Sequence, residues 1–196
     1  MPHTLVLKSS ILAEHSESSR LVDDFVARLD EPKVTVRDLA AVPLPWLDGE
    51  GAQALRGAGE LNERQQALLA LSNELVAELK AAERVVIAAP MYNFHVPVQL
   101  KAWIDLVCRA GVTFRYTEQG PEGLLRGKQA VVISTRGGQH HGSDRDLITP
   151  YMETVLGFLG ISDVEFVYAE GLNMGGDARD SGLNSARARL EQLVAG

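Results

Sequence analysis

The chain contains five short runs of apolar residues, separated by longer amphipathic segments. Each run is rich in Val, Ile and Leu and alternates little with polar residues, which is typical of strands that are covered on both faces. The predicted strands are Thr4–Lys8, Lys33–Leu39, Arg84–Ala89, Gln129–Ser134 and Val164–Ala169. Such runs indicate the interior of a parallel sheet.

The segments between these runs predict helices, because their apolar residues recur at spacings of three and four. The clearest helix start is Asn62, which is followed three residues later by Gln65 in a capping-box pattern. The apolar stripes fall within residues 21–29, 68–79, 100–107, 148–159 and 183–193. Regular alternation of strands and helices predicts an α/β fold with helices on both faces of the sheet and right-handed crossovers.

Two stretches interrupt this alternation, Ala40–Leu61 and Val112–Gly127. Both are rich in Gly and Pro and predict largely irregular excursions. Long loops in compact domains are usually functional or disordered. Since no repeat or linker divides the chain, residues 1–196 are expected to form one domain.

Composition narrows the class of protein and its partners. The 196 residues are 45% hydrophobic and 23% charged, with a net charge of −7. The basic residues are scattered, which argues against nucleic-acid binding. The single Cys108 excludes an internal disulfide and suits a reducing compartment. We find no export signal, no apolar run of the roughly 20 residues that a membrane helix needs, and no metal-ligand spacing. We therefore expect a cytoplasmic protein without a metal or a membrane span.

The loops after the first, third and fourth strands are the expected place for chemistry, because ligands of such sheets bind beyond the carboxyl ends of the strands. The first loop, Ser9–Ser19, carries five serines and leads into a helix. Hydroxyls and a helix N-terminus favour an anion. The loop matches neither a dinucleotide glycine motif nor a P-loop, so a phosphomonoester fits it best. A plain helix cap surrounded by ordinary loop serines is equally compatible with this loop taken alone.

The other two loops add features that suit a planar ligand. Pro90 ends the third strand, and Met91–Phe94 then offers backbone amides and two aromatic rings. The fourth strand leads into Thr135–Gly138, where two glycines allow close backbone approach and Arg136 offers a charge for anionic oxygen. Each loop alone is also compatible with an ordinary core-packed loop or turn. Together, the three loops favour flavin mononucleotide (FMN).

Long blocks of the chain closely resemble the bacterial FMN-dependent NADH azoreductases, also described as NADH:quinone oxidoreductases. The matching blocks are Leu7–Leu12, Ser16–Ser18, Ala88–Phe94, Arg109–Glu118, Gly120–Leu124, Thr135–Gly138 and Gly157–Ile161. They span essentially the whole chain. The resemblance implies a flavodoxin-like fold, a five-stranded parallel sheet in the order 2-1-3-4-5.

The resemblance also implies roles for individual residues, in a homodimer with two equivalent FMN sites near the interface. It places Ser10, Ser16, Glu17 and Ser18 at the phosphate, Met91, Tyr92, Asn93 and Phe94 along the flavin ring, and Thr135, Arg136, Gly137 and Gly138 at its pyrimidine edge. The implied substrate pocket includes Arg56, Tyr116 and Phe158. Because a carboxylate beside a phosphate is unfavourable, we expect the side chain of Glu17 to turn outward and only its backbone to contribute.

The implied reaction is a ping-pong transfer of two electrons from NADH or NADPH through FMN to quinones or aromatic azo compounds. The cofactor supplies this chemistry, so no side chain is predicted to be catalytic. The alternative is a flavodoxin-type FMN electron carrier, which would not need the two long excursions as pocket walls. A signalling receiver domain would require an aspartate after the third strand, where this chain has Pro90–Asn93. The sequence does not choose between NADH and NADPH or identify the physiological substrate.

Overall fold

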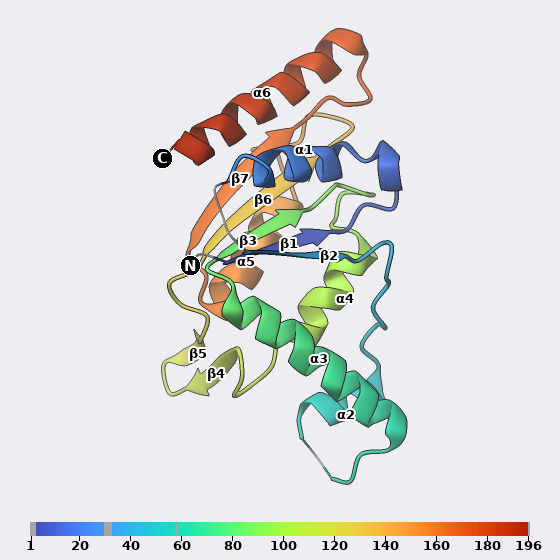
Figure 1. The fold of residues 1–196 in the computed structure, drawn as a ribbon, viewed down its shortest axis with the longest axis vertical. Coiled ribbons are helices and arrows are strands. Elements are labelled where there is room, and N and C mark those ends of the chain that lie inside the picture. Colours follow the sequence, from blue (N-terminus) through green and yellow to red (C-terminus); the bar gives the residue numbers. More distant parts are fainter. Residues whose placement is uncertain (1–2, 30–32, 58, 196) are drawn as a thin grey trace.

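The computed structural model describes residues 3–29, 33–57 and 59–195. Five parallel strands form the central sheet in the order β2-β1-β3-β6-β7 (Figure 1). Their bounds are His3–Lys8 (β1), Lys33–Asp38 (β2), Arg84–Ala88 (β3), Gln129–Thr135 (β6) and Asp163–Ala169 (β7). Numbered within this sheet alone, the order is 2-1-3-4-5, so the predicted flavodoxin-like topology is confirmed.

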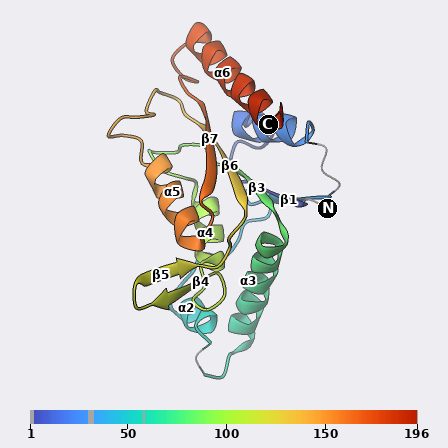
Figure 2. The ribbon, with the colours of Figure 1, turned by 90° about the vertical axis from the view of Figure 1, so that its left-hand side faces the viewer.

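Helices cover both faces of the sheet, because successive strand residues point to opposite sides. Leu5 and Leu7 of β1 belong to one buried cluster and Val6 belongs to the other. The cluster around Val6 packs under α1 (Glu17–Val26) and α6 (Gly176–Ala195), and the cluster around Leu5 and Leu7 packs under α3 (Glu63–Ala81), α4 (Val98–Val107) and α5 (Ile148–Leu159). Figures 1 and 2 show α1 and α6 on the side of the sheet opposite α3 and α4.

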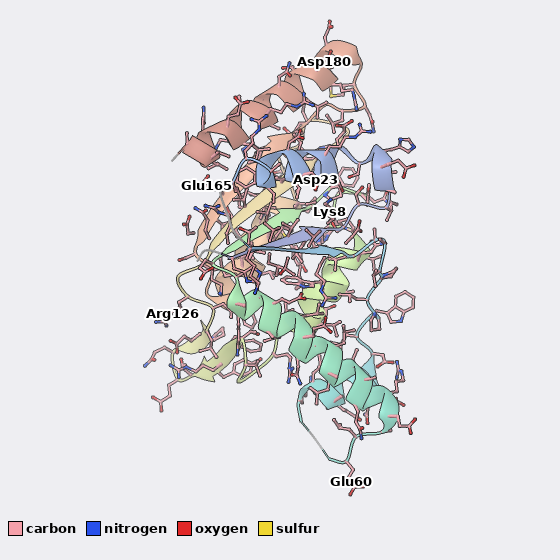
Figure 3. The ribbon with its side chains drawn as sticks, viewed as in Figure 1. Lys8, Asp23, Glu60, Arg126, Glu165 and Asp180 are labelled. Atoms are coloured by element: carbon pink, nitrogen blue, oxygen red, sulfur yellow. The ribbon has the colours of Figure 1, made fainter. Side chains whose placement is uncertain are left out.

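The predicted capping box at the start of α3 is confirmed. The side chain of Asn62 accepts a hydrogen bond from the backbone of Gln65, and the side chain of Gln65 accepts one from the backbone of Asn62. Charged side chains lie on the outside of the layers (Figure 3), where Lys8 Nζ lies 2.6 Å from Asp23 Oδ1 and links the end of β1 to α1. Within the described residues, no helix is both long enough and apolar enough to cross a membrane.

The two excursions contain more regular structure than their glycines and prolines predict. The first includes α2 (Gly49–Leu55), whose N-cap Asp48 accepts a hydrogen bond from the amide of Gly51. The second folds into an antiparallel hairpin of β4 (Phe114–Thr117) and β5 (Gly120–Gly123). Tertiary packing explains the difference, because both elements are too short to be stable alone and rest on α3 and α5.

The hairpin lies at the amino edge of the sheet. The amide of Leu125 donates to the carbonyl of Leu159 at 2.9 Å, and α5 ends there before the chain enters β7. Gly123 lies so close to this helix end that a Cβ at its position would lie 2.0 Å from the backbone nitrogen of Gly160. Only glycine allows this approach.

Two glycine-to-alanine substitutions should therefore have opposite effects on stability. Gly123→Ala should lower the free energy of unfolding by about 1–3 kcal/mol, because the rigid backbone of α5 must move. Gly157→Ala, inside α5 with no atom within 4 Å of the new Cβ, should raise it by about 0.5–1 kcal/mol. Urea denaturation of both variants measures the two changes. Equal effects would contradict the described packing of the hairpin on α5.

Candidate functional site

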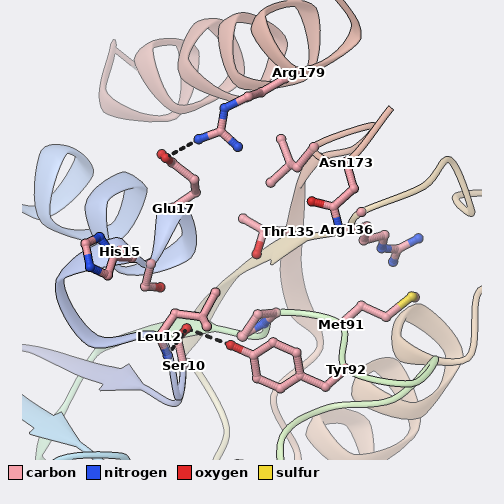
Figure 4. Close-up of a pocket in the computed structure, with 14 residues that line it drawn as sticks. Ser10, Leu12, His15, Glu17, Met91, Tyr92, Thr135, Arg136, Asn173 and Arg179 are labelled. Atoms are coloured by element: carbon pink, nitrogen blue, oxygen red, sulfur yellow. Dashed lines mark hydrogen bonds and ion pairs between the residues drawn. The ribbon is translucent and has the colours of Figure 1, made fainter. Parts of the chain in front are cut away.

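Hydrogen bonds bring three of the predicted loops together at the carboxyl edge of the sheet. Ser10 Oγ, after β1, lies 2.8 Å from the phenol oxygen of Tyr92, after β3. The amide of Met91 donates to the carbonyl of Thr135, at the end of β6, over 2.8 Å. Residues of all three loops line one pocket (Figure 4). The predicted meeting of these loops is thus present in the structure.

The serine loop forms the first wall of this pocket. A short 3-10 turn, Ala13–His15, leads into Ser16, which caps α1 by accepting a hydrogen bond from the amide of Ser19 at 3.1 Å. Ser10 and Ser16 are buried and line the pocket. Ser18 lies behind them, with its Oγ 3.1 Å from Ser16 Oγ, and does not line the pocket. The first turn of α1 thus presents hydroxyls and the positive end of a helix, an arrangement that suits an anion.

The loop after β3 makes a tight turn held by two backbone hydrogen bonds between Tyr92 and His95, of 3.0 and 3.1 Å. Its two central residues, Asn93 and Phe94, have φ angles of 49° and 70°. Such a left-handed pair costs free energy when neither residue is glycine, and backbone strain of this kind clusters at functional sites. Met91 and Tyr92 line the pocket, whereas Asn93 and Phe94 lie outside its lining.

The glycines after β6 are fixed by the loop that follows β7. The carbonyls of Arg136 and Gly137 accept hydrogen bonds from the amides of Leu172 and Asn173, at 3.1 and 2.9 Å. In a trans peptide, N–H and C=O point in opposite directions, so the amides of Gly137 and Gly138 are directed away from that loop. Gly137 lines the pocket and Gly138 does not. A Cβ on Gly137 would lie 2.6 Å from the side chain of Asn173, which explains the glycine there.

Arg136 differs from its prediction. Its side chain is fully buried and does not offer its charge to an anion at the pocket. The guanidinium donates to Asp146 Oδ1 at 2.8 Å and to Glu170 Oε1 at 3.3 Å, and lies 4.8 Å from the ring centre of Tyr168. A buried guanidinium must be paired, and the nearby carboxylates provide that pairing. Arg136 therefore anchors the loop from behind, while its backbone faces the pocket.

Glu17 also differs from its prediction. Its side chain is only 12% exposed, lines the pocket and does not turn out into solvent. Its Oε1 accepts from Arg179 Nη2 at 2.5 Å and from Arg20 Nη1 at 3.0 Å. The pairing with Arg179, which comes from α6, accounts for the inward position of the carboxylate.

Leu172, Asn173 and Arg179 line the pocket but were not among the predicted site residues. They follow the fifth strand of the sheet, whose carboxyl end lies at the same edge as the other three loops. The signal was present in the glycine-containing segment Glu170–Gly176, since the rule that selects the loops after the other strands applies equally here.

Arg56, Tyr116 and Phe158 are not brought to the pocket within one chain. Tyr116 is 76% exposed on β4, and Phe158 contacts Phe114 with ring centres 4.3 Å apart. The hairpin that they adjoin lies at the amino edge of the sheet, and strands of five to seven residues separate the two edges by roughly 20 Å. Arg56 is exposed at the end of α2. No cluster of metal-ligating side chains occurs within residues 3–29, 33–57 and 59–195.

Electrostatics make the network behind the pocket sensitive to acid. Burial alone would raise the pKa of Asp146, but hydrogen bonds from Arg136 and Thr149 outweigh it and lower the pKa from 3.8 to about 2. A carboxyl whose pKa is lower in the folded state stabilises the fold above pH 3.8, and this contribution is lost as the pH falls toward 2.

Asp146→Asn should lower the free energy of unfolding by about 3 kcal/mol at neutral pH, because it weakens the pairing of a buried guanidinium. The difference from the parent protein should shrink by about 2 kcal/mol as the pH is lowered to 2, because protonation then neutralises the parent carboxylate too. Denaturant titrations at several pH values measure this difference, with the exposed neighbour substitution Asp144→Asn as control. A pH-independent difference would contradict the network.

Comparison with known proteins agrees with this geometry. The chain matches the family described as having a flavodoxin-like fold over residues 2–194. It is 61% identical to an FMN-dependent NADH:quinone oxidoreductase of Aeromonas salmonicida, covering 99% of this chain and 100% of that one. It is 59% identical to the protein of the same name from Vibrio vulnificus, covering 100% of both chains.

Solved structures agree with the fold. An azoreductase from Bacillus anthracis is 26% identical and superposes with a TM-score of 0.90, covering 99% of each chain. An FMN-dependent NADH-azoreductase from the same species, solved in complex with FMN, is 24% identical with a TM-score of 0.87 over 99% of this chain and 100% of that one. The chain therefore belongs, within the flavodoxin-like fold, to the family of FMN-dependent NADH:quinone oxidoreductases.

Proposed function

We propose that this protein binds FMN in the pocket at the carboxyl edge of the sheet and reduces quinones and aromatic azo compounds with NADH. The observation that carries the proposal is the joining of the serine loop to the aromatic turn by the contact between Ser10 and Tyr92. This contact places an anion-binding helix start beside a platform for a planar ring. A phosphate and a flat heteroaromatic ring are the two ends of FMN.

The phosphate would lie at the start of α1. Ser10 and Ser16 line the pocket there and their hydroxyls can donate to phosphate oxygens. Ser18 acts on Ser16, because its Oγ lies 3.1 Å from the Ser16 hydroxyl and fixes the direction in which that hydroxyl donates. The residues present fit a phosphomonoester, since the helix start adds backbone amides and a positive dipole end.

The flavin ring would lie between the aromatic turn and the loop after β6. Met91 and Tyr92 provide apolar surface and exclude water, while Thr135 and Gly137 border the opposite side of the pocket. The amides of Gly137 and Gly138 can hold negative charge on the pyrimidine edge, and the backbone bonds to Leu172 and Asn173 keep them oriented before any ligand binds. Asn93 and Phe94 flank this ring site rather than line it.

Bound FMN supplies the transfer of two electrons between a reduced nicotinamide and an acceptor. The chain holds and orients the reactants, and no side chain is assigned as nucleophile or base. The names of the relatives support NADH as donor and quinones as acceptors. The structural neighbour from Bacillus anthracis is an azoreductase, which supports azo compounds as further acceptors. The cytoplasm, where NADH is regenerated, is the compartment we propose.

We further propose a homodimer in which each flavin is covered by the partner. Tyr116 and Phe158 lie at the edge of the sheet opposite the pocket, so one chain cannot bring them to its own flavin. A second chain can, and the 76% exposure of Tyr116 leaves its ring available for such a contact. Arg56, exposed on α2, would belong to the same composite substrate pocket.

The double substitution Ser16→Ala with Ser18→Ala should weaken FMN binding by at least ten-fold, since each lost charge-assisted contact is worth about 1.5–3 kcal/mol. Quenching of flavin fluorescence measures the affinity. The parent protein should consume NADH steadily with a quinone or an azo dye, whereas an electron carrier should not. Unchanged FMN affinity in the double variant would contradict the phosphate site, and absence of turnover in the parent would contradict the enzyme.

Mixed dimers test the composite pocket. Tyr116→Ala should lower kcat/KM for quinones by about ten-fold in its own dimer, because part of the pocket wall is removed. A dimer of one Tyr116→Ala chain and one Ser16→Ala/Ser18→Ala chain retains one site in which intact serines face the intact tyrosine of the other chain. Its activity should return to about half that of the parent. No gain over the two parental variants would contradict a pocket shared between chains.

A further inference from the structure

A carboxylate lies where the proposed phosphate site should exclude one. Glu17 is the first residue of α1, and its side chain lines the pocket beside Ser16. Its charge would repel a phosphate at short range. The structure contains a compensating charge, because Arg179 Nη2 lies 2.5 Å from Glu17 Oε1.

Two arginines pair with this carboxylate, and they are placed differently. Arg20 lies on the same helix, donates to Glu17 at 3.0 Å and to the carbonyl of Glu14 at 2.8 Å, and does not line the pocket. Arg179 comes from α6 and lines the pocket. Figure 4 shows its guanidinium at the mouth of the pocket, joined to Glu17. Only one of its two terminal amino groups makes this bond, and a guanidinium has five N–H donors.

We propose that Arg179 is a phosphate-binding residue of this protein. With one amino group it holds the Glu17 carboxylate, and with its remaining donors it binds the oxygens of the FMN phosphate. The inference rests on the phosphate position given under the proposed function. Arginine suits this double task, because its planar fork can bind two anionic groups at once.

This role has a consequence for which flavin is selected. Riboflavin has the same ring as FMN but no phosphate, so it gains nothing from Arg179 and is not repelled by Glu17. The ion pair therefore makes binding depend on the phosphate. A purely structural role, in which Arg179 only ties α6 to α1, would affect FMN and riboflavin equally.

The first experiment compares the two arginines. Flavin-free full-length protein is titrated with FMN and with riboflavin, and dissociation constants are read from flavin fluorescence. Arg179→Ala should weaken FMN binding about ten-fold and leave riboflavin binding within about two-fold. The matched control Arg20→Ala, which removes the other partner of the same carboxylate, should change neither affinity by more than about two-fold. Equal losses for both ligands in Arg179→Ala, or an FMN affinity unchanged by that substitution, would overturn the proposal.

The second experiment removes the carboxylate. Glu17→Gln should tighten FMN binding, because the repulsion disappears. If Arg179 contacts the phosphate directly, adding Arg179→Ala to Glu17→Gln should still weaken FMN binding about ten-fold. If Arg179 acts only by holding Glu17, its removal should have no effect in this background, and that result would overturn the proposal.

The serine variants keep this test separate from the proposed phosphate position. If Ser16→Ala/Ser18→Ala loses FMN affinity and Arg179→Ala does not, the phosphate lies where proposed and the role of Arg179 is wrong. If the serine variant keeps its FMN affinity, the phosphate position itself is wrong, and the inference about Arg179 falls with it.

Discussion

Parallel strand pairing is the constraint on which the site depends. All five strands of the sheet run in the same direction, so the loops that follow them emerge at one edge. Side-chain and backbone hydrogen bonds then join these loops to each other, from Ser10 to Tyr92, from Met91 to Thr135, and from Asn173 to Gly137. The pocket is therefore assembled from segments that are far apart in sequence. Its shape is set before a ligand arrives, which lowers the entropic cost of binding.

Buried charge organises the same edge on two sides. Behind the pocket, Arg136 is neutralised by Asp146 and Glu170, and this pairing holds the glycine loop in place. At the mouth, Glu17 and Arg179 form a second pair that remains partly accessible. The two pairs differ in what they can do. A fully buried guanidinium is committed to its partners, whereas a partly exposed one at a pocket can bind a further anion.

The sequence predicted the features that follow from local pattern. The five strands, the capping box at Asn62 and the convergence of three loops all have signals in spacing or composition. It did not predict the direction of Arg136 or Glu17, because each depends on a charge more than nine residues away, at Asp146 or at Arg179. The helix α2 and the β4–β5 hairpin were missed because tertiary contacts outweigh their glycines. The contribution of Tyr116 and Phe158 concerns a second chain, which loops within one chain cannot place.

We propose an FMN enzyme whose cofactor is recognised at both ends, by its phosphate and by its ring. The most direct measurement is the visible spectrum of the purified protein, together with identification of the flavin released on denaturation. We predict a yellow protein that releases FMN, with one flavin per chain. A colourless protein that fails to take up added FMN, or one that releases only a flavin without the terminal phosphate, would contradict this recognition at both ends.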